Sequence, residues 1–106
     1  MKVISREKNR NENMINEYIK ELEKLHKGKI RAKIVNGKTY YYLYYREGKK
    51  VLSKYVGKDE DSLTIVREEL ARRRQIEEIL KKLKEEKSQI KKLEAMIWYY
   101  TMVVIW

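Results

Sequence analysis

The sequence of 106 residues contains no cysteine and no proline, and it has only one histidine and four glycines. Without cysteine the chain can form no disulfide and offers no thiolate ligand to zinc or an iron–sulfur cluster, which suits a reducing cytoplasm. The absence of proline leaves long stretches able to form uninterrupted helices and strands. A chain of this length supports a modest core, so we expect a single domain over residues 1–106.

The side chains that catalysis commonly requires are scarce. His26 is the only histidine, and no serine stands in a context resembling a nucleophile elbow. We expect His26 to lie in the last turn of a helix and to interact with the helix C-terminus. The sequence therefore predicts a protein that is not an enzyme, with no catalytic residue, no metal site and no cofactor.

The net charge of +10 is unevenly distributed along the chain. Residues 1–58 hold 16 Lys or Arg against 6 acids, whereas residues 59–106 hold 10 against 10. Within residues 27–58 the count is 10 basic residues against Glu47 alone. Such a concentration predicts a polyanionic partner, because Lys and Arg that contact phosphates release condensed counterions. Solubility alone is the simpler alternative, but it does not require the charge to gather in one segment.

Hydrophobic periodicity and turn residues predict an α+β fold. Apolar residues at helical spacing indicate a short N-terminal helix over residues 12–27, capped by Asn11 or Asn13 and ended by Gly28. Alternating strands with turns at Asn36-Gly37 and Glu47-Gly48 indicate a three-stranded antiparallel meander over residues 29–57. A long C-terminal helix is predicted over residues 60–97, followed by a hydrophobic tail over residues 98–106.

A two-residue turn at Asn36-Gly37 fixes which side chains share a face of this sheet. Rings and cations alternate on one face, where we expect Arg31, Lys33, Tyr40, Tyr42 and Tyr44. The third strand has two possible registers, one adding Val51, Ser53 and Tyr55 to that face and the other adding Lys50, Leu52 and Lys54. Bases stack on tyrosine rings while cations track phosphates, so the face fits nucleic-acid binding. Tyrosine is also common on half-exposed strands, so a purely structural role remains the competing interpretation.

Two features of the long helix also suggest binding. Arg72, Arg73 and Arg74 could grip a phosphate backbone or an acidic groove, although neighbouring glutamates could pair with them instead. Beyond them an apolar stripe approximates a heptad seam and predicts a partner helix, supplied by the first helix or by a second copy of the chain in a homodimer. The predicted interface residues are Ile76, Ile79, Leu83, Ile90, Leu93 and Trp98.

The tail is uncharged from Ala95 onward and contains both tryptophans. It is shorter than the roughly 20 residues of a transmembrane helix, and the polar N-terminus does not resemble a secretory signal. We therefore expect a cytoplasmic protein without membrane contact. The strand character of residues 101–106 suggests that this end adds to the meander or packs under it. Because an exposed apolar tail favours aggregation, we expect it to be covered by this chain, by a second copy or by a partner protein.

The string GKIRAKIVNGKTYYYLYYREGKKVLSKYVGKDE, followed by ELARRRQIEEILKKLKEE, resembles small uncharacterised proteins of bacterial and phage genomes. These proteins have a YYYLxYREGxKxxSKYxGK core before a charged, coiled-coil-like helix. The resemblance covers residues 28 to about 93 and implies a mobile-element setting, in which DNA-binding proteins and anti-CRISPR inhibitors are common. Similar proteins carry cysteine motifs between the first two strands, which this chain lacks. At the level of fold alone, the arrangement is similar to the arm-type DNA-binding domain of tyrosine recombinases.

Two functions are consistent with these patterns. The first is a non-catalytic module that binds DNA or RNA through the Tyr/Lys/Arg face, assisted by Lys50, Lys54 and the three arginines. The second is a phage-type anti-defence inhibitor that blocks a host defence or nucleic-acid-enzyme protein, with the long helix and tail serving for docking or dimerisation.

Overall fold

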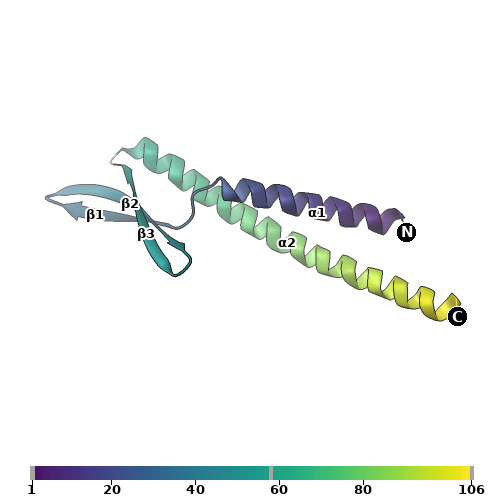
Figure 1. The fold of residues 1–106 in the computed structure, drawn as a ribbon. Coiled ribbons are helices and arrows are strands. Elements are labelled where there is room, and N and C mark those ends of the chain that lie inside the picture. The colour runs from purple at the N-terminus through teal and green to yellow at the C-terminus, as the bar shows by residue number, and fades with distance from the viewer. Residues whose placement is uncertain (1, 58, 106) are drawn as a thin grey trace. The chain divides into compact units, whose positions relative to one another are not determined.

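The structure, a computed structural model, describes residues 2–57 and 59–105. The elements run in the order α1 (Lys2–Glu23), β1 (Lys29–Val35), β2 (Lys38–Glu47), β3 (Lys50–Gly57) and α2 (Glu60–Ile105). Figure 1 shows a helix, a three-stranded sheet and a long helix in that order, which confirms the predicted α+β class. No helix in the described part of the chain is long and apolar enough to cross a membrane.

The chain divides into two compact units. The sheet unit is Lys24–Gln75, which holds the three strands and the beginning of α2. The helical unit combines α1 with the part of α2 from Ile76 onward. Each unit has buried apolar side chains of its own.

The three strands form one antiparallel sheet in the order β1-β2-β3. Val35 pairs with Lys38 across the first turn, where Asn36 (φ 51°) and Gly37 (φ 76°) adopt the left-handed conformations of a type I′ turn. The register predicted from this turn is therefore confirmed. The second turn consists of Gly48 and Lys49, one residue later than expected, because Glu47 pairs with Lys50.

One face of the sheet packs against the first part of α2. Leu43, at 1% exposure, forms a core with Val66 and Leu70 of α2, and the partly buried Ile30, Tyr45 and Val56 pack around it. A register shift between Tyr41 and Tyr42 leaves Val56 opposite no single partner, which is the arrangement of a β-bulge. Alternation along the strands therefore places the odd-numbered residues of β2 toward the helix and the even-numbered ones on the opposite face.

Gly28 marks the entry into β1 and tolerates no side chain. A Cβ at this position would lie 2.1 Å from the carbonyl oxygen of Tyr44, and its φ of 113° disfavours any other residue. This glycine therefore lets the chain run close against the backbone of β2 before the strand begins.

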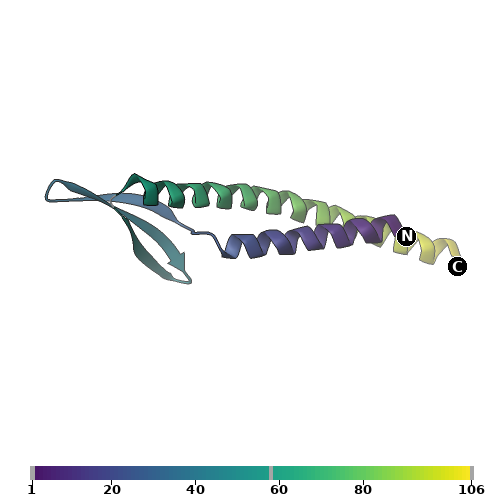
Figure 2. The same ribbon diagram turned by 90° about the horizontal axis from the view of Figure 1, so that it is seen from above.

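In the helical unit, α1 lies beside α2, as Figures 1 and 2 both show. Most buried and half-buried positions of the two helices in this unit recur at alternating spacings of four and three residues, the period of an antiparallel coiled-coil seam. The seam is formed by Ile4, Lys8, Asn11, Ile15, Tyr18 and Leu22 of α1 with Ile76, Leu80, Leu83, Lys87, Ile90, Glu94 and Ile97 of α2. Lys8 Nζ lies 3.5 Å from a carboxylate oxygen of Glu94, which joins the two helices at a polar level of the seam.

The prediction for the first helix was wrong at both ends. It runs from Lys2 to Glu23 instead of residues 12–27, and Asn11 lies inside it instead of capping it. Asn11 is 1% exposed, and its Nδ2 donates a hydrogen bond to the carbonyl oxygen of Leu83 at 2.8 Å. The residues before Asn11 contain no proline or glycine, and tertiary packing along the seam extends the helix through them.

The prediction for the end of the long helix was also wrong. The helix continues to Ile105, so residues 101–105 are helical and do not form a strand; Trp106 lies outside the described residues. No glycine or proline interrupts residues 98–105. Each residue added to an existing helix gains one backbone hydrogen bond, so the helix extends through them. From Trp98 to Val104 the apolar side chains remain exposed, from 50% at Met102 to 72% at Trp98.

Candidate nucleic-acid interface

Alternation along the three strands collects cations and tyrosines on the sheet face opposite the α2 core. Pairing places Arg31 beside Tyr42, Lys33 beside Tyr40, and Tyr42 beside Tyr55. We call this surface the tyrosine face. It consists of Lys29, Arg31, Lys33 and Val35 of β1, Lys38, Tyr40, Tyr42, Tyr44 and Arg46 of β2, and Val51, Ser53 and Tyr55 of β3.

The tyrosine face has five cations, four tyrosines and no acidic residue among its described strand positions. Only Glu47 is acidic in the strands, and alternation places it on the opposite face. Phosphate oxygens approaching this surface would meet no like charge, so the local field favours a polyanion.

The tyrosine rings contact one another and also a cation. The ring centroid of Tyr55 lies 5.5 Å from that of Tyr42 and 6.3 Å from that of Tyr40, both in tilted arrangements. The guanidinium carbon of Arg31 lies 5.6 Å from the ring centroid of Tyr44, a cation–π contact. These contacts leave Tyr42 and Tyr44 half-buried, while Tyr55 remains 49% exposed. The rings are therefore partly ordered before any ligand binds, which reduces the entropy lost on stacking.

A hollow of about 410 Å³ opens where β1 begins and β2 ends. Its lining includes Lys29, Arg31 and Arg46, together with the ring-bearing Tyr44 and the exposed Val51. All its lining residues are strand residues, apart from Gly28, which precedes β1. Three cations line this hollow with a ring beside them, so its charge favours an anionic group.

The structure places the predicted basic residues of β3 elsewhere. The register that adds Val51, Ser53 and Tyr55 to the tyrosine face is the one observed. Lys50 pairs with Glu47 and Lys54 pairs with Leu43, so both lie on the side of the helix core and not with the tyrosines. Sequence reasoning omitted Lys29, Lys38 and Arg46 from the face, although extending the same alternation by one position at each strand end would have included them.

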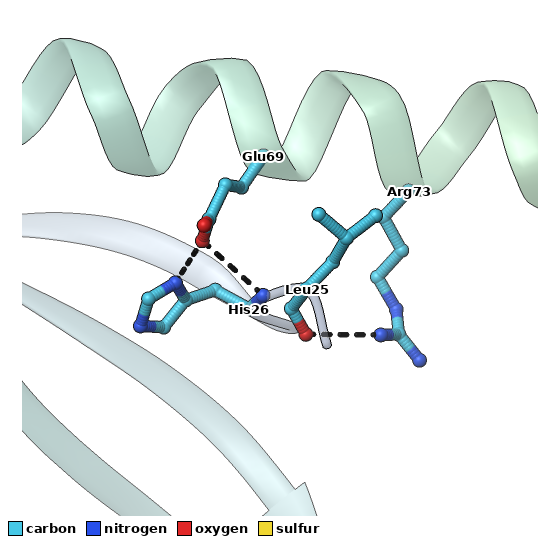
Figure 3. Close-up of polar contacts among 4 residues, drawn as sticks. All are labelled: Leu25, His26, Glu69 and Arg73. Atoms are coloured by element: carbon cyan, nitrogen blue, oxygen red, sulfur yellow. Dashed lines mark hydrogen bonds and ion pairs between the residues drawn. The ribbon is translucent and has the colours of Figure 1, made fainter. Parts of the chain in front are cut away.

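The three consecutive arginines of α2 have different surroundings. Nη1 of Arg73 donates to the carbonyl oxygen of Leu25 at 3.4 Å, and Nη1 of Arg72 donates to Oε1 of Gln75 at 3.5 Å. Arg74 is exposed. Arg73 therefore contacts the segment before β1 (Figure 3), and the three side chains do not share one set of partners.

His26 lies in the segment after α1 and not in its last turn. Its backbone N–H donates to Oε2 of Glu69 at 3.4 Å, and its Nδ1 forms a hydrogen bond with the same oxygen (Figure 3). The His26 hydrogen bond lowers the pKa of Glu69 below its ordinary value of 4.5, with a further contribution from the charge of Lys54. The role of this pair is to fix the chain before β1 against α2. No three His, Asp or Glu side chains among the described residues are grouped to hold a metal ion.

The predicted interface residues of the long helix fall into two groups. Ile76, Leu83 and Ile90 are buried in the seam with α1, so the first helix supplies a partner within the same chain. Ile79 is half-buried, whereas Leu93 is 50% and Trp98 is 72% exposed. The seam uses Leu80, Lys87 and Glu94 in place of Ile79 and Leu93. Lys87 and Glu94 are polar, so the apolar spacing alone did not predict these seam positions.

Comparison with known proteins identifies a family but no characterised relative. No curated protein and no solved structure matches the chain significantly. Residues 4–64 match the family described as a domain of unknown function (DUF6788), a range that includes nearly all of α1 and the complete sheet. The match covers more than half of the chain and every position of the tyrosine face, so the chain belongs to the DUF6788 family.

Proposed function

We propose that the chain is a non-catalytic module that binds nucleic acid through the tyrosine face. The observation that carries the proposal is the composition of that face, with five cations, four tyrosines and no acid on one side of a three-stranded sheet. Cations at this density bind phosphates independently of sequence, and rings between them stack on unpaired bases.

The ring arrangement favours single strands over duplexes. Tyrosine rings can stack only on bases that are not covered by their neighbours, as in single-stranded DNA or RNA. Each stacked base contributes about 1–3 kcal/mol, while the cations contribute affinity that falls with salt. We expect a log–log slope of affinity against salt of about −3, corresponding to four or so phosphate contacts on a single strand.

The test is binding of fluorescent single- and double-stranded DNA and RNA to the intact chain across a salt series. Arg31→Ala with Tyr42→Ala removes one cation and one ring from the tyrosine face and should weaken binding at least tenfold, by about 1.4 kcal/mol or more. Lys92→Ala with Tyr99→Ala is the matched control, since it also removes one cation and one ring, but from exposed positions of α2. The control should bind as the unaltered chain does.

Half-buried Tyr42 contacts Tyr55, so its loss could disturb the sheet. Arg31→Ala with Lys33→Ala changes only exposed side chains, so we expect this variant to fold. It tests the tyrosine face even if the first variant does not fold. Equal affinity of this folded variant and the unaltered chain would overturn the proposal. Failure of the unaltered chain to bind any of the four nucleic acids would direct the search toward an acidic protein surface instead.

A further inference from the structure

A second basic groove lies on the other side of β1 within the sheet unit. It has a volume of about 640 Å³, and its lining includes Lys29 of β1 with Arg67 and Arg74 of α2. Leu70, Tyr41 and Gly28 are among the remaining lining residues, and none of the described residues that line the groove is acidic. We call it the edge groove, because β1 is an outer strand of the sheet.

The geometry of α2 accounts for the charge of this groove. Arg67 and Arg74 are seven residues apart, so they lie on the same face of the helix about two turns, or roughly 10 Å, apart. The residues between them on that face are Leu70 and Ala71, neither of which is acidic. Both arginines are exposed, and in the described part of the chain neither forms an ion pair. Their charge is therefore available to a ligand.

The edge groove adjoins the hollow of the tyrosine face. The two cavities share Gly28 and Lys29 in their linings, so they meet where the chain enters β1. Among the residues that the structure describes, five cations and no acid line the two cavities together: Lys29, Arg31, Arg46, Arg67 and Arg74. Because Gly28 can carry no side chain, nothing larger than backbone separates the two hollows at that residue.

From this continuity we propose that the edge groove binds the phosphodiester backbone of a nucleic-acid strand whose bases stack on the tyrosine face. The strand passes around the beginning of β1, with Lys29 contacting phosphate at the junction and Arg67 and Arg74 contacting phosphates beyond it. This inference rests on the proposed function and adds to it the path of the bound strand and the minimum strand length that reaches the groove. A strand that is too short to pass Lys29 gains nothing from the groove.

The experiment compares short and long single strands on the intact chain. A site of this kind spans about 4 to 16 nucleotides, so oligonucleotides of about 4 and about 16 nucleotides bracket it. Arg67→Gln with Arg74→Gln should weaken binding of the long strand roughly tenfold at about 0.1 M salt and reduce the magnitude of its salt slope by about 1.4. The same variant should leave binding of the short strand unchanged.

Three further variants make the result specific. Arg67→Lys with Arg74→Lys keeps the charges and should retain most of the affinity for the long strand. Lys81→Gln with Lys84→Gln removes two charges from exposed positions outside the sheet unit and should have little effect. Arg31→Ala with Lys33→Ala should weaken binding of both strands.

The outcomes separate the two proposals. If the tyrosine-face variant weakens binding while the Arg67 and Arg74 variant leaves both strands unaffected, the edge groove is not part of the path and only this inference is overturned. The same holds if the Arg67 and Arg74 variant weakens both strands equally. If the unaltered chain binds neither strand, the proposed function fails and this inference fails with it.

Discussion

At the scale of single residues, one carboxylate connects two distant segments of the sheet unit. Glu69 of α2 accepts hydrogen bonds from the backbone and from the ring of His26, which lies 43 residues earlier in the chain. Arg73, one helical turn later, binds the carbonyl oxygen of Leu25. Both contacts hold the residues just before Gly28, where the backbone must approach Tyr44 closely. The path of the chain into β1 is thus held by side chains of α2.

The lowered pKa of Glu69 predicts how stability depends on pH. Since its pKa in the folded chain is below the ordinary 4.5, its ionised form stabilises the fold above pH 4.5, and this contribution is lost as pH falls through the lowered pKa. Glu69→Gln should therefore lower the free energy of unfolding by about 1 kcal/mol near neutral pH, since the pair is partly exposed. The difference should shrink as pH falls through the lowered pKa and the carboxylate becomes protonated.

Urea unfolding of both proteins from about pH 7 to about pH 3 measures this difference directly. Other carboxylates titrate in both proteins and cancel in the comparison. Glu68→Gln, at the exposed neighbouring position, is the control and should run parallel to the unaltered chain. A difference that persists unchanged at the lowest pH would show that the His26 contact does not depend on the charge of Glu69.

At the scale of secondary-structure elements, the strands were predictable and the helix ends were not. The Asn36-Gly37 turn and strict alternation define the register of β1 and β2, because a shift by one residue would exchange the two faces. The first helix was predicted to begin ten residues too late because Lys8 and Asn11 occupy seam positions and break the apolar period. The contact between His26 and Glu69 joins residues distant in sequence, so no local pattern reveals it.

The same limits apply to the candidate site. The composition of the tyrosine face followed from alternation, but the edge groove depends on how α2 crosses the sheet, which the sequence does not specify. The sequence therefore did not show that Arg67 and Arg74 line a groove while Arg72 and Arg73 do not, because this depends on the packing of Leu70 against Leu43. The sequence left two registers open for β3, and the observed pairing is the one that places Tyr55 on the face.

The buried amide of Asn11 predicts a gain in stability on its removal. Its Nδ2 donates to Leu83, but its Oδ1 has no hydrogen-bond partner among the described residues. The carbonyl of Leu83 keeps its helical hydrogen bond when Asn11 is replaced, so little is left unsatisfied. Asn11→Leu should raise the free energy of unfolding by about 1 kcal/mol, as measured in urea, at the expense of a unique helix register.

Asn13→Leu is the matched control, because this asparagine lies on the same helix and is exposed. It should change the free energy of unfolding by no more than about 0.5 kcal/mol. If Asn11→Leu instead destabilises the chain, the hydrogen bond to the Leu83 carbonyl stabilises the fold by more than the buried, unpaired Oδ1 destabilises it. Asn11 would then be a stabilising contact of the seam and not only a determinant of its register.

At the scale of the whole molecule, the two units have separate buried cores on one continuous helix. Leu43, Val66 and Leu70 form the core of the sheet unit, whereas the core of the helical unit is the seam between α1 and the later part of α2. Proteins open locally in cooperative units that often coincide with such packing. The sequence predicted one domain, and the two cores raise the question of whether the chain unfolds as one.

Leu43→Ala answers this question when it is combined with amide hydrogen exchange. Leu43 is 1% exposed, and its truncation should destabilise the sheet unit by about 2–5 kcal/mol. We expect faster exchange throughout β1, β2 and β3, with protection largely retained at the seam residues Leu80, Leu83 and Ile90. Leu83→Ala should produce the reverse pattern, because it opens a cavity in the helical unit. Equal acceleration of all amides by either variant would show that α2 couples both cores into a single cooperative domain, as the length of the chain alone predicts.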